Sequence, residues 1–451
     1  MPSFTERFKF IGHALAGDGP FRPVVTENGL GVASLAGASA LVRYPRESEE
    51  KYARRNDVAF FDNPMAQAVD RFVGYLYSQP TIRSYPHDLY AAMAEDVDGK
   101  DNDIDVFWQQ FSIAAKARGS MLLLVDMPAA VAPNLAEQLQ ARVAPYWAAI
   151  APELITDYQI GDDGKFDFAE FSGSYTRPDG EKVPCRWRFD RAGWECRDQE
   201  KRLLDAGDHP LGECPLLIFT EGGDFPHFGS FSPIADLSRR LFNLDSELDE
   251  IMRSQTFSLL TMQVPENSPE QQKLQAAQTA GQTISSSNLL VHSGSTPAFI
   301  APPDGPARIY MDRIDQIRDR IDQIGLNVNV QGGSKQKESG IALQMRFQAL
   351  NGELSRFAAR MEDLERRAWS LSQRWLGLSM APEIGWSRDY NLSDVATELT
   401  ILADMQASAM PTPVIVEQQK RIAVQQFCGL ESKRKDELMQ AIDERGSAIG
   451  A

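Results

Sequence analysis

The feature that most constrains this 451-residue chain is an apolar stripe between residues 343 and 375. Apolar residues recur there in alternating steps of four and three, the heptad spacing of a helix with one buried seam. The residues of the stripe are Leu343, Phe347, Leu350, Leu354, Phe357, Met361, Leu364, Ala368, Leu371 and Trp375. The predicted helix is roughly 50 Å long at 1.5 Å per residue, and we expect Gly377 to end it. Such a seam needs a partner surface, which a cyclic arrangement of identical subunits would supply.

Two shorter periodic segments precede the stripe. Ser232 followed by Pro233 is typical of a helix start, and we expect this helix to reach about Gln263. Its apolar residues step by three and four: Ile234, Leu237, Leu241, Leu244, Leu248 and Ile251. A further helix is expected at 308–325, where one face carries Ile314, Ile317, Ile321 and Ile324. Two of these helices are far longer than the average of roughly 11–12 residues.

The first part of the chain mixes helices with strands. Its first 45 residues are glycine-rich, and we expect them to form an extended arm. A helical pattern from Glu47 to Tyr77 is broken at Asn63, because the proline that follows disfavours helix there. Another helix is expected at 104–118, ended by the glycine after it. The short apolar run from Met121 predicts a buried strand.

Residues 153–220 have the pattern of a β-meander, in which short aromatic and β-branched runs alternate with turns. The last of these runs is CPLLIFTE. Residues 264–307 are polar and glutamine-rich, with one predicted hairpin in NLLVHSGSTPAFIA. After a loop at 327–339, the long helix leads to a short strand near Ile384 and two or three further helices. The sequence therefore predicts an α+β fold that is mainly helical.

The chain carries 63 acidic and 46 basic residues, a formal net charge of −17. This balance argues against a protein that grips nucleic acid by neutralising phosphates, although a protein can enclose DNA without holding it. No signal peptide or membrane span is expected. Four scattered cysteines indicate reduced thiols rather than a disulfide framework or a zinc site. They are Cys185, Cys196, Cys214 and Cys428.

No motif for catalysis, nucleotide binding or metal binding stands out, so we expect no enzyme activity, no metal and no cofactor. The segment GGSKQKESG lacks the spacing of a phosphate-binding loop. The five histidines lie in separate segments. The acidic cluster at 96–105 does not form an EF-hand pattern. A calcium-binding loop that starts at Asp101 needs glycine at its sixth position and glutamate at its twelfth, where this chain has Val106 and Ser112. We interpret the cluster as a turn that caps the helix from Ile104.

Four segments carry a resemblance to a known family. They are EEKYARRNDVAFFDNPMAQAVDRFVGYLYSQP from Glu49, DVDGKDNDIDVFWQQFSIAAKARGSMLLLVDMP from Asp96, FGSFSPIADLSRRLFNLDSELDEI from Phe228 and ESGIALQMRFQALNGELSRFAARMEDLE from Glu338. In order and spacing the chain resembles tailed-bacteriophage portal proteins, the head-to-tail connectors, in particular the uncharacterised-family portals of siphophage and podophage type. Ile234 stands where that family usually has leucine, and the last 70 or so residues match only loosely.

The resemblance implies the phage portal fold, with wing, stem, clip and crown, assembled as a dodecameric ring at one capsid vertex. The implied divisions are the wing at 1–231 (N-terminal arm, helices and β-meander), stem helix 1 at 232–263, the clip at 264–307, stem helix 2 at 308–326, the tunnel loop at 327–339, the long wing helix at 340–379 and the crown at 380–451.

The resemblance also implies a role and partners. The ring would be the channel for DNA packaging and ejection, and the docking site for the terminase large subunit and for head–tail adaptor proteins. Its other implied partners are copies of itself, the major capsid protein and double-stranded DNA, contacted without sequence preference, with no membrane. The implied location is the portal vertex of the virion, reached from the host cytoplasm during assembly.

Two groups of residues are candidates for the channel. An acidic stripe lies opposite the isoleucines of the 308–325 helix, and an acidic channel wall would repel phosphates and let DNA slide. Its residues are Asp312, Asp315, Asp319 and Asp322. Lys335 and Lys337 lie in the predicted tunnel loop, where they would meet DNA electrostatically. The simpler interpretations are a solvated helix face for the aspartates and a solvated loop for the lysines.

Two other classes of protein remain open from the sequence. One is another coiled-coil-containing virion structural or adaptor protein, which would share the heptads but lack the β-rich block. The other is a hydrolase or nucleotide-binding enzyme whose site has no recognised motif.

Overall fold

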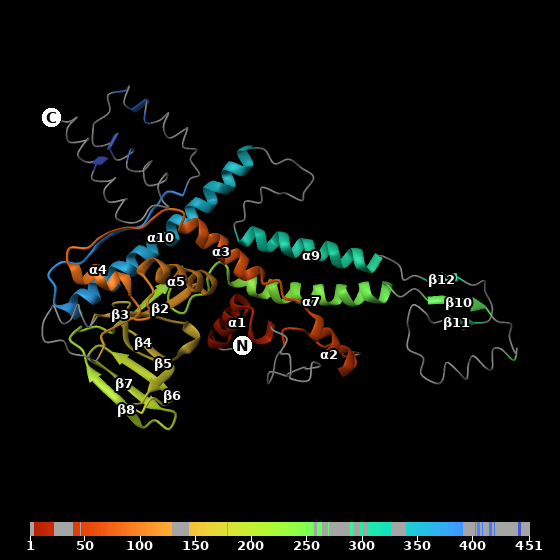
Figure 1. Cartoon of the computed structure of the whole chain (residues 1–451), viewed down its shortest axis with the longest axis horizontal. Helices are drawn as coiled ribbons and strands as arrows, with labels where there is room; N and C mark the ends of the chain where they lie inside the picture. The colour runs from red at the N-terminus through yellow and green to blue at the C-terminus, as the bar shows by residue number, and fades with distance from the viewer. Residues whose placement is uncertain are drawn as a thin grey trace. The chain divides into compact units, whose positions relative to one another are not determined.

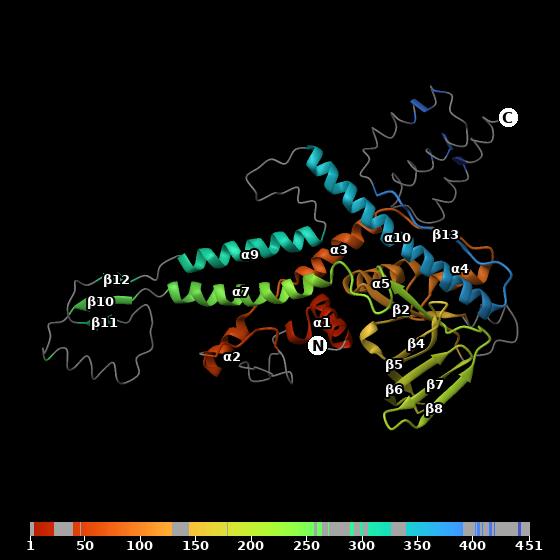
Figure 2. The same cartoon turned by 180° about the vertical axis from the view of Figure 1, so that it is seen from behind.

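The structure is a computed structural model, shown in Figures 1 and 2. It describes residues 4–21, 39–45, 47–128, 144–177, 179–256, 259–263, 289–292, 298–300, 305–325 and 340–390, and isolated positions elsewhere. Helix and sheet are mixed, and the chain forms two compact units. The first unit comprises Met1–Gly12, Gln67–Ser232 and Gly325–Ala451, and the second comprises His13–Ala66 and Pro233–Ile324.

The first unit contains a three-stranded antiparallel sheet. Its central strand, β2 (Ser120–Asp126), lies between β3 (Tyr146–Ile150) and β9 (Leu216–Thr220). β2 is buried along almost its whole length, because helices cover one face and a second sheet covers the other. This burial explains its continuous apolar run and confirms the predicted strand. Helix α5 (Ile104–Arg118) precedes β2, and Gly119 ends it as predicted, with a φ of 84°.

The β-rich block forms a five-stranded antiparallel meander, as predicted. Its strands, in spatial and sequence order, are β4 (Ile155–Ile160), β5 (Phe166–Thr176), β6 (Lys182–Asp190), β7 (Gly193–Asp198) and β8 (Leu203–Asp208). The run CPLLIFTE was wrongly assigned to this meander, since it forms β9 and pairs with β2. A continuous apolar run suits the more deeply buried sheet better than a partly solvated meander.

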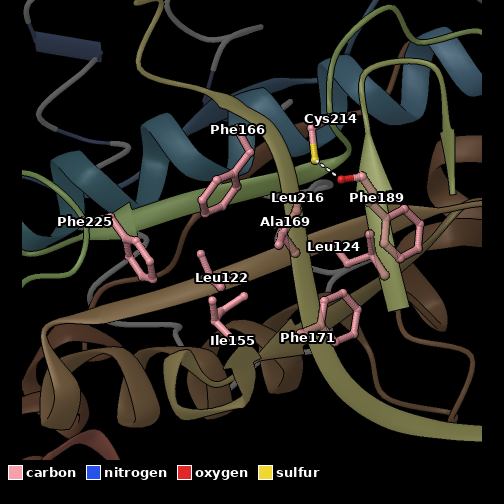
Figure 3. Packing of buried hydrophobic residues seen from close by; sticks show 10 residues of the cluster. All are labelled: Leu122, Leu124, Ile155, Phe166, Ala169, Phe171, Phe189, Cys214, Leu216 and Phe225. Atoms are coloured by element: carbon pink, nitrogen blue, oxygen red, sulfur yellow. Dashed lines mark hydrogen bonds between the residues drawn. The ribbon is translucent and has the colours of Figure 1, made fainter. Parts of the chain in front are cut away.

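A hydrophobic core lies between the meander and the three-stranded sheet (Figure 3). Leu122 and Leu124 of β2 contribute to it from one side, and Phe171 and Phe189 from the meander. The thiol of Cys214 donates a hydrogen bond to the carbonyl oxygen of Phe189 at 3.6 Å. The core therefore joins the two sheets, and the strands of the meander lie in the sequence between β3 and β9 of the three-stranded sheet.

Helix α10 (Gly340–Leu376) is the helix predicted from the heptad stripe, and Gly377 ends it with a φ of 65°. Its seam is buried from Leu350 to Leu371. The covering surface belongs to the same chain. Phe357 packs edge-to-face on Phe72 and on Phe219, each at 5.5 Å between ring centroids. From Leu350 to Leu371, the expectation that neighbouring subunits bury this seam was therefore wrong, because the chain's own strands and helices already cover it.

Six shorter elements complete the described part of the first unit, and two of them, α1 and α3, run on into the second. They are α1 (Phe4–Ala16), α3 (Pro64–Leu76), β1 (Ile82–Ser84), α4 (Asp88–Glu95), the 3-10 turn η2 (Pro152–Leu154) and β13 (Glu383–Gly385). β1 pairs with β13, which confirms the strand predicted near Ile384. α1 corrects the expectation of an extended arm, because Phe8 and Ile11 recur at helical spacing and are fully buried.

The second unit is dominated by two antiparallel helices. α7 (Ser232–Thr256) and α9 (Gly305–Ile324) lie side by side in both views (Figures 1 and 2). On α9, Ile314, Ile317 and Ile321 are buried, as their spacing predicted, and Ile324 is half-buried. We refer to α7 and α9 together as the helical hairpin.

A small sheet lies in the segment between the two helices. β10 (Leu259–Gln263) is central, parallel to β11 (Leu289–His292) and antiparallel to β12 (Ala298–Ile300). Two predictions are corrected by this sheet. The helix expected over 232–263 ends at Thr256, because residues 259–263 pair with strands on both sides. The predicted hairpin does not form, since β11 and β12 flank β10 rather than pairing with each other.

The rest of the described second unit includes α2 (Glu49–Val58) and the 3-10 turn η1 (Gly19–Phe21). The predicted helical region from Glu47 is confirmed as α2 and α3. The helical conformation is interrupted before Pro64, and Asn63 has a φ of 47°. The predicted tunnel loop at 327–339 lies outside the described residues. So do most of the clip at 264–307 apart from its strands, and nearly all of the crown beyond residue 390.

Candidate functional site

The predicted acidic stripe lies on α9. Asp312, Asp315 and Asp319 are exposed, and Asp322 is half-buried. Ile314, Ile317 and Ile321 of the same helix face the protein interior. A period of 3.6 residues puts the two sets on opposite sides of the helix. α9 therefore has one packed apolar face and one acidic face that is mostly open to solvent.

Polar contacts join α9 to α7. The Tyr310 hydroxyl donates a hydrogen bond to Oε2 of Glu247 at 2.6 Å, and the Arg318 guanidinium lies 3.9 Å from the Asp245 carboxylate. The hydrogen bond with Glu247 raises the pKa of Tyr310 to about 12. Burial raises the pKa of Asp245 despite the opposing charge of Arg318. These contacts join the two helices of the helical hairpin through residues outside the acidic stripe.

The helical hairpin also leaves apolar side chains uncovered. Met252 on α7 is 52% exposed, and Ile309 and Met311 on α9 are 69% and 53% exposed. Leu244 and Leu248, which belong to the apolar stripe predicted for α7, are only half-buried. Large exposed apolar side chains are candidates for contact with another protein. The helical hairpin thus offers both an acidic face and apolar contact points.

Lys335 and Lys337, the other predicted channel residues, lie outside the described residues.

A groove of about 870 Å³ lies in the first unit, between β9 and one face of α10. Three arginines of α10 line it, namely Arg356, Arg360 and Arg367. Arg360 donates a hydrogen bond to the carbonyl oxygen of Thr220 at 3.2 Å, and Arg367 donates to that of Ile218 at 3.5 Å. The arginines thus contact the main chain of β9 across the groove.

A buried ion cluster supports the wall of this groove. The Lys116 side chain is fully buried, and its ammonium contacts the carboxylates of Glu221 and Glu353, the latter at 3.0 Å. It also donates to the hydroxyl of Ser230 at 3.1 Å. Glu221, Glu353 and Ser230 all line the groove. One buried lysine therefore joins α5, the end of β9, the segment before α7, and α10.

Aromatic rings and a further arginine complete the surroundings of this lysine. The rings of Phe72 and Phe231 lie with their centroids 4.2 and 4.4 Å from Nζ of Lys116. Burial raises the pKa of Glu353, but the charges of Lys116 and Arg356 outweigh burial and hold that pKa below its ordinary value. The two cations thus keep the Glu353 carboxylate charged despite its burial.

Sequence reasoning missed this cluster. Only Lys116 has a local signal, since it shares the buried face of α5 with Trp108 and Ser112. Its partners Glu221 and Glu353 are 105 and 237 positions away in the sequence. No spacing rule joins residues so far apart.

The acidic cluster at 96–105 is the turn that the sequence predicted. Asp103 caps α5 by accepting a hydrogen bond from the backbone N–H of Val106 at 2.8 Å. Asp98 accepts one from the N–H of Lys100 at 3.0 Å. Within the described ranges, no group of three or more His, Cys, Asp or Glu residues is placed to hold a metal ion. No helix in that part of the chain is long and apolar enough to span a membrane.

Comparisons with known proteins give only distant structural similarity. No protein-family model and no curated protein sequence matches the chain. Among solved structures, it is similar to a chain from the virion of a native gene transfer agent particle, with 12% identity, a TM-score of 0.40, and coverage of 89% of this chain and 95% of that one. It is also similar to a chain from the neck of an empty gene transfer agent particle, with 11% identity, a TM-score of 0.42, and coverage of 86% and 92%. Similarity at this level assigns neither a family nor an activity.

Proposed function

We propose that the chain is a portal subunit of a tailed phage or a phage-like particle. Copies would form a closed dodecameric ring at one capsid vertex, and DNA would be packaged and ejected through its channel. The proposal rests on the order of the four portal-like sequence segments and on one structural observation. That observation is the helical hairpin, whose α9 packs isoleucines on one side and exposes aspartates on the other.

In this proposal the acidic face of α9 lines the channel. A wall of carboxylates repels the DNA phosphates, so the duplex passes without sticking. The net charge of −17 favours such passage over a grip on DNA. The exposed Met252, Ile309 and Met311 would contact the neighbouring helical hairpins, since a ring built by head-to-tail contacts buries a different surface on each side of a subunit.

The remaining roles belong to the same proposal. The chain acts as a structural protein rather than an enzyme. It resides at the portal vertex of the virion, where the major capsid protein surrounds it. The terminase large subunit docks during packaging, and head–tail adaptor proteins dock afterwards.

Reversing the charge of the acidic face tests the channel assignment. A variant carrying Asp312→Lys, Asp315→Lys and Asp319→Lys should bind duplex DNA at least about tenfold more tightly than the unaltered ring. Its affinity should also fall steeply with salt, because each phosphate contact adds about 0.9 to the slope of log K against log salt. Fluorescence anisotropy with a labelled duplex longer than the channel, at several salt concentrations, measures both effects.

A matched control tests whether the position of the added lysines matters, or only the change in net charge. Asp157→Lys, Asp162→Lys and Asp179→Lys change the net charge equally at exposed positions of the meander region. If this control binds DNA as tightly as the α9 variant, the acidic face is an ordinary solvated surface and the channel assignment fails.

A further inference from the structure

We propose that the groove between β9 and α10 is a docking site for an extended, acidic segment of a second copy of the chain, which adds to β9 as a new strand. This inference rests on the proposed function, because it requires copies of the chain to assemble. It concerns a different surface from the acidic face of α9.

The open edge of β9 supplies the main-chain groups for such a strand. The N–H of Glu221 donates to the carbonyl oxygen of Gly119, and the N–H of Val125 donates to that of Pro215. In an antiparallel pair, hydrogen-bonded positions alternate. The N–H and C=O groups of Ile218 and Thr220 therefore point away from β2. In the described part of the chain no other strand pairs with this edge.

Arginines occupy the carbonyl groups of that edge in the isolated chain. Arg360 and Arg367 contact the carbonyl oxygens of Thr220 and Ile218. Both are long side chains on α10, so they can release the carbonyls to an incoming strand and turn to its carboxylates. An added strand pairs through its main chain, which gives affinity, while the side chains of the groove select the sequence.

The charges of the groove favour an acidic partner. Arg356 is paired with Glu353, and Arg367 lies 3.8 Å from the Asp363 carboxylate. The carboxylate of Glu221 is balanced by the buried Lys116, which also contacts Glu353. Arg360 contacts a carbonyl oxygen but is paired with no carboxylate in the described part of the chain. The groove thus has a surplus positive charge in a protein that is otherwise strongly acidic.

The dimensions and chemistry fit a peptide rather than DNA. From Glu353 to Arg367, α10 runs for about 21 Å at 1.5 Å per residue. That length accommodates roughly six extended residues at 3.3 Å each. Three carboxylates line the groove beside its arginines, namely Glu221, Glu353 and Asp363. A phosphate backbone has no N–H and C=O groups to pair with the open edge of β9, whereas a peptide strand can use that edge as well as the surplus arginine. With 63 acidic residues, a second copy offers suitable segments.

Site-specific photocrosslinking tests the assignment. Ala359 is exposed and lines the groove, so p-benzoylphenylalanine placed there should crosslink to another copy in assembled rings. Mass spectrometry should locate the crosslink in a short segment that contains aspartate or glutamate. The same group at Ala206, which is exposed on β8, is the control and should give no such product.

Charge reversal provides a second, independent measurement. Arg360→Glu should raise the protein concentration needed for half-maximal ring assembly about tenfold, because a like charge then faces the acidic segment. Arg54→Glu is the control. It makes the same change at an exposed position of α2 that does not line the groove. We expect this control to shift assembly less than about threefold.

The outcomes separate this inference from the proposed function. Rings that form normally but give no crosslink between copies at position 359 overturn the groove assignment and leave the portal proposal standing. A crosslink only to DNA, or only within one copy, overturns it as well. If the unaltered chain never forms rings and never crosslinks between copies, both proposals fail.

Discussion

Replacing Lys116 with methionine should destabilise the first unit strongly. The side chain of Lys116 is fully buried, and methionine keeps much of its volume while removing the ammonium. Glu221 would then lose its ammonium partner, and Glu353 would keep only the contact with Arg356. Removing one partner of a buried ion pair costs about 3–5 kcal/mol, because the other charge is left unpaired. Urea titration followed by tryptophan fluorescence measures this loss, since Trp108, Trp147 and Trp369 are buried in the same unit.

The effect should depend on pH with a defined sign. Lys116 and Arg356 hold the pKa of Glu353 below its ordinary value of 4.5 despite burial. The carboxylate therefore stabilises the unaltered protein above about pH 4.5. That contribution is lost as the pH falls through the lowered value. Without Lys116, burial favours the protonated form, so the free-energy gap between the two proteins should narrow from pH 7 to pH 4.

A surface lysine serves as the control for this prediction. Lys165 is 42% exposed and contacts Glu213, so Lys165→Met should cost less than about 1 kcal/mol. A Lys116→Met variant that loses no more than this control at pH 7, or whose deficit does not change with pH, would refute the importance of the buried cluster.

Two further predictions concern the long helix and the predicted tunnel loop. Phe357→Asp should prevent folding of the first unit or cost more than about 3 kcal/mol, because an unpaired charge would enter the packing of Phe72 and Phe219. Circular dichroism and urea titration would show this, and normal stability would contradict it. Lys335→Ala combined with Lys337→Ala should leave ring assembly intact and alter DNA packaging or retention in assembled heads. Packaging and retention of a full-length genome, as with the unaltered chain, would identify both lysines as solvated loop residues.

Local periodicity accounts for the elements that the sequence predicted well. The heptad stripe located α10, a glycine located the end of α5, and the isoleucine spacing located the buried face of α9. Each of these signals depends on residues a few positions apart. The exposure of Asp312, Asp315 and Asp319 follows from the same spacing, because a helix with one packed face leaves the opposite face open.

Pairing between distant segments accounts for the errors. CPLLIFTE reads as one more strand of the meander, but it forms β9 because β2 offers a better buried edge. Residues 259–263 continue an apolar helical pattern, yet they form β10 because two later segments pair with them. The α10 seam was expected to need other subunits, whereas residues such as Phe72 and Phe219 cover it. Partner identity is a tertiary property that local spacing does not contain.

The candidate sites differ in the same way. The sequence predicted the acidic face of α9, but it predicted neither the Lys116 cluster nor the groove between β9 and α10. The groove is formed by the open edge of β9 and by the face of α10 that carries Arg360 and Arg367. These arginines lie more than a hundred residues after β9 in the sequence. Which residues face a channel depends on the arrangement of several copies, which one chain cannot specify.

Electron microscopy of the purified full-length protein tests the central claim most directly. The proposed function predicts closed, dodecameric rings with a central channel. In a map that resolves helices, the acidic face of α9 should line that channel. Particles that are only monomers or dimers, or rings in which α9 lies on the outer rim away from the channel, would contradict it.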